Sequence, residues 1–92
     1  MYYFYILQSQ QNTEWFYKGI TADLKKRLVR HKTGQVRSTA SYVPLRLVYY
    51  EVYLSKAEAK RREWSVKYHG SVSVPLLKRI KRSLADLGGD LN

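Results

Sequence analysis

Apolar and polar positions divide much of the chain into short segments of β character. Residues 2–7 and 15–20 are rich in aromatic and β-branched residues, and the polar stretch between them contains Asn12, a turn former. A third apolar segment, residues 45–53, follows Pro44. Such runs, bounded by polar or turn-forming residues, are typical of strands. The pattern therefore predicts an antiparallel hairpin near the N-terminus and a third strand later in the chain.

Side-chain alternation groups four residues of the predicted hairpin. Successive side chains of a strand point to opposite faces of its sheet. Tyr3 and Tyr5 then share one face of the first strand, and Tyr17 and Gly19 share one face of the second. Pairing of the two strands can bring these two faces together.

Residues 22–33 have the spacing of an amphipathic helix. Thr21 is a plausible N-cap, and Asp23 lies in the first turn, where an acidic residue is favourable. Leu24 and Leu28 are one helical turn apart and form the expected inward stripe. The sequence therefore predicts a helix directly after the hairpin.

This helix and the loop after it carry most of the polar residues that could meet phosphate. Arg27 and His31 are four residues apart, so they are neighbours on one helical face. The solvent side of the helix carries four more basic residues, Lys25, Lys26, Arg30 and Lys32. In the loop over residues 35–44, Arg37 and Thr39 are also available to phosphate oxygens.

Two further helices are expected in the C-terminal half. Ser55 and Glu58 match a capping box, which predicts a helix that begins just after Ser55 and ends near His69. Trp64 is assigned to the core in that helix. Pro75 suits the first turn of a third helix, which has an apolar stripe opposite basic side chains.

The length of 92 residues allows one compact domain, because domains usually have ~100–150 residues. The predicted order of elements is ββαβαα. We expect an α/β protein of the α+β type, with a three-stranded antiparallel sheet flanked by three helices. The domain would span residues 1–85, with residues 86–92 as a short C-terminal tail around Gly88 and Gly89.

The charge of the chain favours a phosphate-rich partner. Seventeen Lys and Arg residues oppose seven Asp and Glu residues, which gives a net charge of +10 at pH 7. A strongly basic domain of this kind is typical of nucleic-acid binding, with DNA or RNA as the partner. Solvated surface lysines or a membrane-surface binder are the alternatives that composition alone leaves open.

The remaining composition favours the cytoplasm. The chain has no cysteine, which excludes disulfides and thiolate metal sites and fits a reducing compartment. Its N-terminus lacks a basic leader and a small-residue cleavage site, so it resembles a strand rather than a signal peptide. No apolar run approaches the ~18 residues of a membrane span.

Several motifs in this order resemble the GIY-YIG nuclease domain over nearly the whole chain. The two name-giving triplets would be Tyr3-Phe4-Tyr5 and Tyr17-Lys18-Gly19, and the segments 21–27, 44–51 and 58–63 are similar to the short, stand-alone bacterial branch. The family includes the nuclease domains of the excision-repair incision subunit and of Slx-type endonucleases. Here the first triplet lacks the family's glycine, and Lys18 replaces an aliphatic residue. The polar residue, commonly asparagine, that the family places late in the domain is absent or replaced, because the only asparagines are Asn12 and Asn92.

The resemblance implies a metal-dependent cut in one DNA strand, in repair or recombination, with branched or damaged DNA as a reasonable substrate. Tyr17 would activate the water, Arg27 would hold the scissile phosphate and Glu63 would ligate one Mg²⁺ or Mn²⁺ ion. Tyr5 and His31 would assist. Independently of the resemblance, the missing side chain of Gly19 either relieves crowding in the strand or lets a phosphate approach the backbone.

The chemistry of these residues is consistent with phosphodiester hydrolysis. A tyrosine is a poor base at neutral pH because its ordinary pKa is ~10, so Tyr17 would need nearby cations. Mg²⁺ often accepts only one or two protein carboxylates, so Glu63 alone is sufficient when DNA supplies further oxygens. Glu51, on the third strand, is expected to be structural or paired with a basic residue.

Other interpretations of the same residues remain open. Glu63 is also placed to form a helical ion pair with Lys60 or Lys67, and a strand tyrosine is more often packing than chemistry. The alternative function is a non-catalytic module that holds DNA or structured RNA through Lys and Arg contacts. An accessory subunit that needs a partner is a further alternative.

Overall fold

The computed structural model describes residues 1–90, which form a three-stranded antiparallel sheet with helices on both faces. The strands are β1 (Tyr2–Ser9), β2 (Phe16–Thr21) and β3 (Leu45–Tyr53). Their order in the sheet is β2-β1-β3, so the first strand is central. The predicted hairpin is confirmed, and β3 has the predicted bounds.

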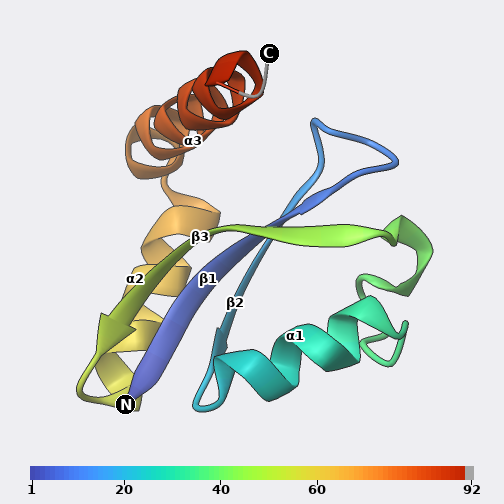
Figure 1. The fold of residues 1–92 in the computed structure, drawn as a ribbon. Coiled ribbons are helices and arrows are strands. Elements are labelled where there is room, and N and C mark those ends of the chain that lie inside the picture. The colour runs from blue at the N-terminus through green and yellow to red at the C-terminus, as the bar shows by residue number, and fades with distance from the viewer. Residues whose placement is uncertain (91–92) are drawn as a thin grey trace.

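Three helices complete the fold in the order ββαβαα (Figure 1). They are α1 (Leu24–Lys32), α2 (Lys56–Tyr68) and α3 (Gly70–Asp90), and a short 3-10 helix, η1 (Ala40–Tyr42), lies in the loop before β3. Figure 1 shows α1 well apart from α2 and α3. The predicted α+β class is therefore confirmed.

Two apolar clusters assign the helices to opposite faces of the sheet. Because side chains alternate along β1, Phe4 and Ile6 face one way, where they pack with Val66 of α2 and with side chains of α3. Tyr5 and Leu7 face the other way, in a second cluster that includes Leu24 and Leu28 of α1. The inward stripe predicted for α1 is confirmed.

The N-terminus of α1 differs from the prediction. The N-cap is Asp23, whose side chain accepts a hydrogen bond from the Lys26 backbone N–H at 3.0 Å. The Thr21 hydroxyl instead accepts a hydrogen bond from the backbone N–H of Asp23 at 3.1 Å. Both residue types are good N-caps, and the strand continues through Thr21, so the cap falls two residues later.

The predicted N-terminus of α2 is confirmed, because the Ser55 hydroxyl accepts from the backbone N–H of Glu58 at 3.2 Å. The helix ends at Tyr68 with His69 as its C-cap, close to the expected end. Trp64, however, is 57% exposed and does not belong to the core. Its side chain lies instead against exposed Tyr68 and His69.

The third helix is longer than predicted at both ends. It begins at Gly70, so Pro75 lies inside it, and it continues through Gly88 to Asp90. Packing of Val72 against the core on the sheet favours helix before the proline, and tertiary packing of this kind can outweigh a local signal. The expected tail is therefore helical over residues 86–90, and its last two residues lie outside the described part. The domain boundary at residue 85 stays a prediction.

Candidate active site

The hairpin positions two tyrosines over one glycine. Tyr5 of β1 pairs with Gly19 of β2, and Tyr17 pairs with Leu7, so both tyrosines lie on the face that α1 covers. A Cβ atom on Gly19 would lie 2.7 Å from the Tyr5 hydroxyl oxygen and 2.8 Å from the Tyr17 ring. The absent side chain therefore leaves the space through which Tyr5 reaches across β2.

This packing agrees with relief of crowding at Gly19 and argues against a phosphate contact there. The residue is buried, and the space above it is filled by the two tyrosine side chains. A phosphate cannot approach the backbone there without displacing them. Gly19 serves the site by admitting the tyrosines rather than by contacting nucleic acid.

Helix α1 brings Arg27 and His31 to the same point. The Tyr5 hydroxyl lies 2.8 Å from Nε2 of His31, and Nε of Arg27 donates a longer hydrogen bond of 3.4 Å to the Tyr5 hydroxyl oxygen. The Tyr17 ring centroid is 5.2 Å from that of His31 and 6.2 Å from that of Tyr5. All four residues predicted to be catalytic thus form one cluster.

His31 continues this cluster into the interior, where it is 1% exposed. Its Nδ1 atom lies 2.8 Å from the hydroxyl of Thr39, which in turn donates to the backbone carbonyl of Val36 at 3.4 Å. A neutral imidazole has one donor and one acceptor nitrogen. Because the Thr39 proton goes to the carbonyl, Nδ1–H is the donor to Thr39, and Nε2 accepts the Tyr5 proton. The chain of hydrogen bonds therefore has a single direction, from Arg27 to Val36.

The protonation states agree with this direction. Burial lowers the pKa of His31 to about 4, and the positive charges of Arg27 and Arg30 contribute to that fall, so the ring is neutral at pH 7. Burial raises the pKa of Tyr5 to about 12 against the opposing hydrogen bond from Arg27. Tyr5 therefore keeps its proton and donates it to His31.

Thr39 departs most clearly from the sequence-based expectation. The sequence suggests a phosphate contact for this residue. Its side chain, however, is completely buried, and its hydroxyl is hydrogen-bonded to His31. Its position in an irregular loop has no periodicity, so no signal in the sequence marks it as the partner of a buried ring. Thr39 is thus a support for His31, a role that sequence reasoning missed.

Arg27 is held as a charged group at the edge of a small cavity. Its hydrogen bond to Tyr5 is the main cause that raises its pKa, and the Tyr17 hydroxyl contributes in the same direction. The cavity has a volume of about 300 Å³ and lies between β2 and α1. It is lined by Ile20, Thr21, Asp23, Lys26, Arg27 and Arg30. Three cations against one carboxylate make it a site that attracts anions.

Glu63 approaches the cluster from α2. Its side chain is partly buried, and its carboxylate lies 3.4 Å from Nζ of Lys67, one helical turn away. Burial is the main cause that raises the pKa of Tyr5, and the negative charge of Glu63 adds to the rise. The carboxylate is therefore within electrostatic range of the Tyr5 hydroxyl. Within residues 1–90, no group of three or more His, Cys, Asp or Glu side chains gathers to hold a metal ion.

Comparison with known proteins identifies the family of the chain that carries this cluster. Residues 1–72 match the family described as the GIY-YIG catalytic domain. This chain belongs to the GIY-YIG family. The matched region contains every residue of the cluster, from Tyr5 on β1 to Glu63 on α2.

Small bacterial GIY-YIG relatives resemble most of this chain. A UPF0213 protein of Lacticaseibacillus paracasei is 37% identical over 68 residues, which cover 73% of this chain and 74% of the relative. A UPF0213 protein of Staphylococcus saprophyticus is 34% identical over 67 residues, covering 72% and 79%. The solution structure of UPF0213 protein BH0048 from Bacillus halodurans is 32% identical and covers 95% of this chain and 85% of that one, with a TM-score of 0.47.

Exposed basic residues lie on and after the helix that contributes Arg27 and His31 to the GIY-YIG cluster (Tyr5, Tyr17, Arg27 and His31). The side chains expected to contact nucleic acid are exposed at five positions, Lys25, Lys26, Arg30, Lys32 and Arg37. Four of them lie on α1, the helix that carries Arg27, and Arg37 lies in the loop that follows it. No helix in the described part of the chain is both long and apolar enough to cross a membrane.

Glu51 lies apart from the GIY-YIG cluster and is structural, as predicted. Its carboxylate accepts from Nε of Arg62 at 2.9 Å and from the Tyr53 hydroxyl at 2.6 Å, and the Tyr49 hydroxyl also donates to it. Every oxygen of the group is thus occupied by neighbours on β3 and α2.

Proposed function

We propose that this protein is a metal-dependent endonuclease that hydrolyses one phosphodiester bond and so nicks one strand of DNA. The observation that carries the proposal is the directed hydrogen-bond chain that holds Arg27 beside Tyr17 at the edge of a cationic cavity. Membership of the GIY-YIG catalytic domain family supports a nuclease fold and a nucleic-acid substrate. One such site in the chain accounts for one cut per binding event.

Arg27 is proposed to bind the scissile phosphate. Its Nε group is turned toward Tyr5, which leaves the terminal NH₂ groups to take phosphate oxygens. A guanidinium binds two oxygens side by side and stays charged at any physiological pH. Lys26 and Arg30 line the same cavity and would add to the attraction of the phosphate. The charge of Arg27 would stabilise the negative charge that builds up on these oxygens during the reaction.

Tyr17 is proposed to activate the water. Tyr5 is unsuited to this task because its proton is committed to His31 and its pKa is raised to about 12, chiefly by burial. His31 is equally unsuited, since its two ring nitrogens are occupied by Tyr5 and Thr39. Tyr17 is partly exposed and is the remaining phenol of the cluster, beside the guanidinium of Arg27. Tyr5 and His31 then act by holding Arg27 in place.

Glu63 is proposed to hold the metal ion. A single, partly buried carboxylate fits Mg²⁺ or Mn²⁺, because Mg²⁺ usually keeps several waters and takes further oxygens from substrate phosphates. When bound, the metal supplies positive charge to the phosphate and lowers the pKa of a bound water. The chain's own part would be to present the Glu63 carboxylate, which would give up its ion pair with Lys67.

A non-catalytic nucleic-acid-binding module is the second candidate. The observation that favours it is the ion pair between Glu63 and Lys67, since a carboxylate already paired on its own helix has a structural role without any metal. The exposed basic residues around α1 would then hold DNA or structured RNA. Metal dependence separates the two candidates, because binding of phosphate by lysines needs no divalent ion.

Nicking of supercoiled plasmid and of a branched duplex with Mg²⁺ or Mn²⁺ tests the proposal. We expect the wild type to nick, with loss of nicking in EDTA, in Glu63→Ala and in Tyr17→Phe, while both variants keep DNA binding. Glu58→Gln is the matched control, because Glu58 is an exposed glutamate on the same helix and should keep full activity. Tight binding without any cutting, unaffected by EDTA, would establish the binding module instead.

A further inference from the structure

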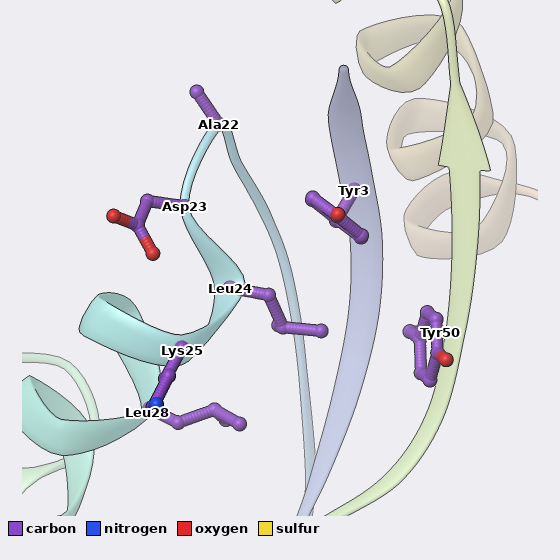
Figure 2. A pocket seen from close by; sticks show the side chains of 7 residues that line it. All are labelled: Tyr3, Ala22, Asp23, Leu24, Lys25, Leu28 and Tyr50. Carbon is purple, nitrogen blue, oxygen red and sulfur yellow. The ribbon is translucent and has the colours of Figure 1, made fainter.

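A second, larger cavity lies on the other side of α1, between this helix and strands β1 and β3 (Figure 2). Its volume is about 440 Å³. Figure 2 shows Leu24 and Leu28 reaching from α1 toward Tyr3 on β1 and Tyr50 on β3. None of the steps proposed for phosphodiester hydrolysis uses this cavity.

Two aromatic rings form the wall of this cavity on the sheet side. Tyr3 and Tyr50 lie on neighbouring strands with ring centroids 6.2 Å apart and planes tilted by 56°. Tyr50 is 52% exposed, so one surface of its ring is open to a ligand. Leu24 and Leu28 supply an apolar surface opposite the rings. Flat aromatic ligands stack on such rings, and every nucleobase has a suitable face.

The charged residues of this cavity fit the backbone of a nucleic-acid strand. Lys25 lines it and is exposed, and it belongs to the basic surface of α1. Asp23 lines both this cavity and the cationic cavity that contains Arg27. The two cavities therefore flank the N-terminus of the same helix. A strand that crosses this helix end can place a phosphate in one cavity and a base in the other.

The register of the sheet links this cavity to the catalytic candidates. Tyr50 pairs directly with Tyr5, and Tyr3 lies two residues before Tyr5 on the same strand face. The family triplet has glycine where this chain has Tyr3, so the aromatic wall comes in part from a departure from the family pattern. The cavity thus lies beside the proposed site but has a chemistry of its own.

We propose that this cavity binds an unpaired nucleobase of the strand that is cut, one or a few nucleotides from the scissile phosphate. The proposal deepens the function proposed above and rests on it for the cut itself. A base in a duplex is stacked and paired, so it enters such a cavity only when it is unpaired or flipped out. The substrate class that follows is DNA with single-stranded character beside the cut, such as a flap or a fork.

Binding to strands with and without bases tests this inference. The probe is a fluorescent single-stranded oligonucleotide in EDTA, compared with an abasic sugar-phosphate strand of the same length. We expect the wild type to bind the base-bearing strand about 5- to 150-fold more tightly than the abasic strand. Tyr50→Ala should remove this preference without changing the affinity for the abasic strand, because it removes the ring and leaves the cations.

Two further variants serve as controls. Tyr50→Phe keeps the ring and should keep the preference. Tyr68→Ala removes an exposed tyrosine from α2, on the opposite face of the sheet, and should also keep it. An unchanged preference in Tyr50→Ala would overturn the inference, as would equal losses on both strands.

The readout separates this inference from the proposed nuclease function. The binding comparison is made without metal, so it is independent of cutting. A base preference that depends on Tyr50, in a protein that never nicks, would support base binding in this cavity and refute the proposed nuclease function. Nicking with no base preference would do the reverse, and failure to bind either strand would refute the inference about this cavity and leave the nuclease to the nicking test.

Discussion

Burial of His31 as a neutral ring makes the stability of this protein depend on pH. The ring lies between Tyr5 and Thr39 in the interior, where its protonation would break the hydrogen bond that Nε2 accepts from Tyr5. A second proton would also place a charge beside Arg27. We therefore predict that the free energy of unfolding falls as the pH drops below neutrality.

The size of the effect follows from the two pKa values of His31. Burial and nearby cations lower the pKa from 6.5 to about 4 on folding. Between these values the unfolded chain binds a proton that the folded chain does not, so stability falls as pH falls. The slope is at most about 1.4 kcal/mol per pH unit, and the total loss between pH 6.5 and about 4.5 is about 2 kcal/mol. That loss is a large part of the roughly 5–15 kcal/mol of a typical domain.

The lower limit of this window keeps the titration of Glu51 out of the measurement. Burial opposes ionisation of Glu51, but hydrogen bonds from Arg62, Tyr49 and Tyr53 hold its pKa below the ordinary 4.5. Its stabilising contribution is present above pH 4.5 and is lost only as the pH falls through its lowered value. The histidine contribution is complete at higher pH and is lost between pH 6.5 and about 4.

Urea unfolding at several pH values between about 4.5 and 7.5, followed by circular dichroism, measures this slope. His31→Gln removes the titrating ring and should flatten the dependence, besides lowering stability at every pH. His69→Gln is the matched control, because His69 is the other histidine of the chain and is exposed. Stability of the wild type that stays constant across the window would refute the reasoning. A His31→Gln protein with the full slope would refute it too.

Three further predictions concern packing and charge. Gly19→Ala should cost about 1–3 kcal/mol of stability and impair cleavage, because its Cβ collides with both site tyrosines. Gly70→Ala, which meets no atom within 4 Å, is its control in thermal unfolding, and equal melting temperatures would contradict the prediction. Glu51→Gln should lower the free energy of unfolding by about 1–3 kcal/mol, because it weakens the hydrogen bonds to this carboxylate. Nicking should stay at the wild-type rate below the melting temperature. A specific loss of nicking would give Glu51 a role in the site. Replacing Lys25 and Lys32 with Gln should weaken DNA binding. It should also make the fall of the binding constant with salt concentration shallower, by about one counterion for each phosphate that is no longer neutralised. An unchanged slope would exclude both residues from the interface.

Local periodicity predicted which residues of the site share a face, whereas their chemical roles came from the family resemblance. Alternation along two strands grouped Tyr5, Tyr17 and Gly19, because the period of a strand does not depend on the rest of the protein. Helical spacing brought Arg27 and His31 to one face in the same way. The strand and helix order, and with it the fold class, follows from the same short-range patterns.

Long-range packing decided the features that these local patterns do not predict. Thr39 became the partner of a buried ring because an irregular loop folds back under α1, and nothing in the sequence near Thr39 encodes that path. Pro75 lies inside a helix because Val72 before it packs on the sheet. Trp64 is exposed because the apolar face of α2 is formed by Ala59 and Val66.

The sequence by itself therefore determined the order of the elements, the basic surface of α1 and the residues that share each face. The tertiary structure alone decided how those residues interact: the tautomer of His31, the proton that Tyr5 keeps, and the need for glycine at position 19. The physical reason is that strand and helix periods are set by the backbone. Burial and hydrogen-bond direction, by contrast, depend on which distant segments close over a side chain.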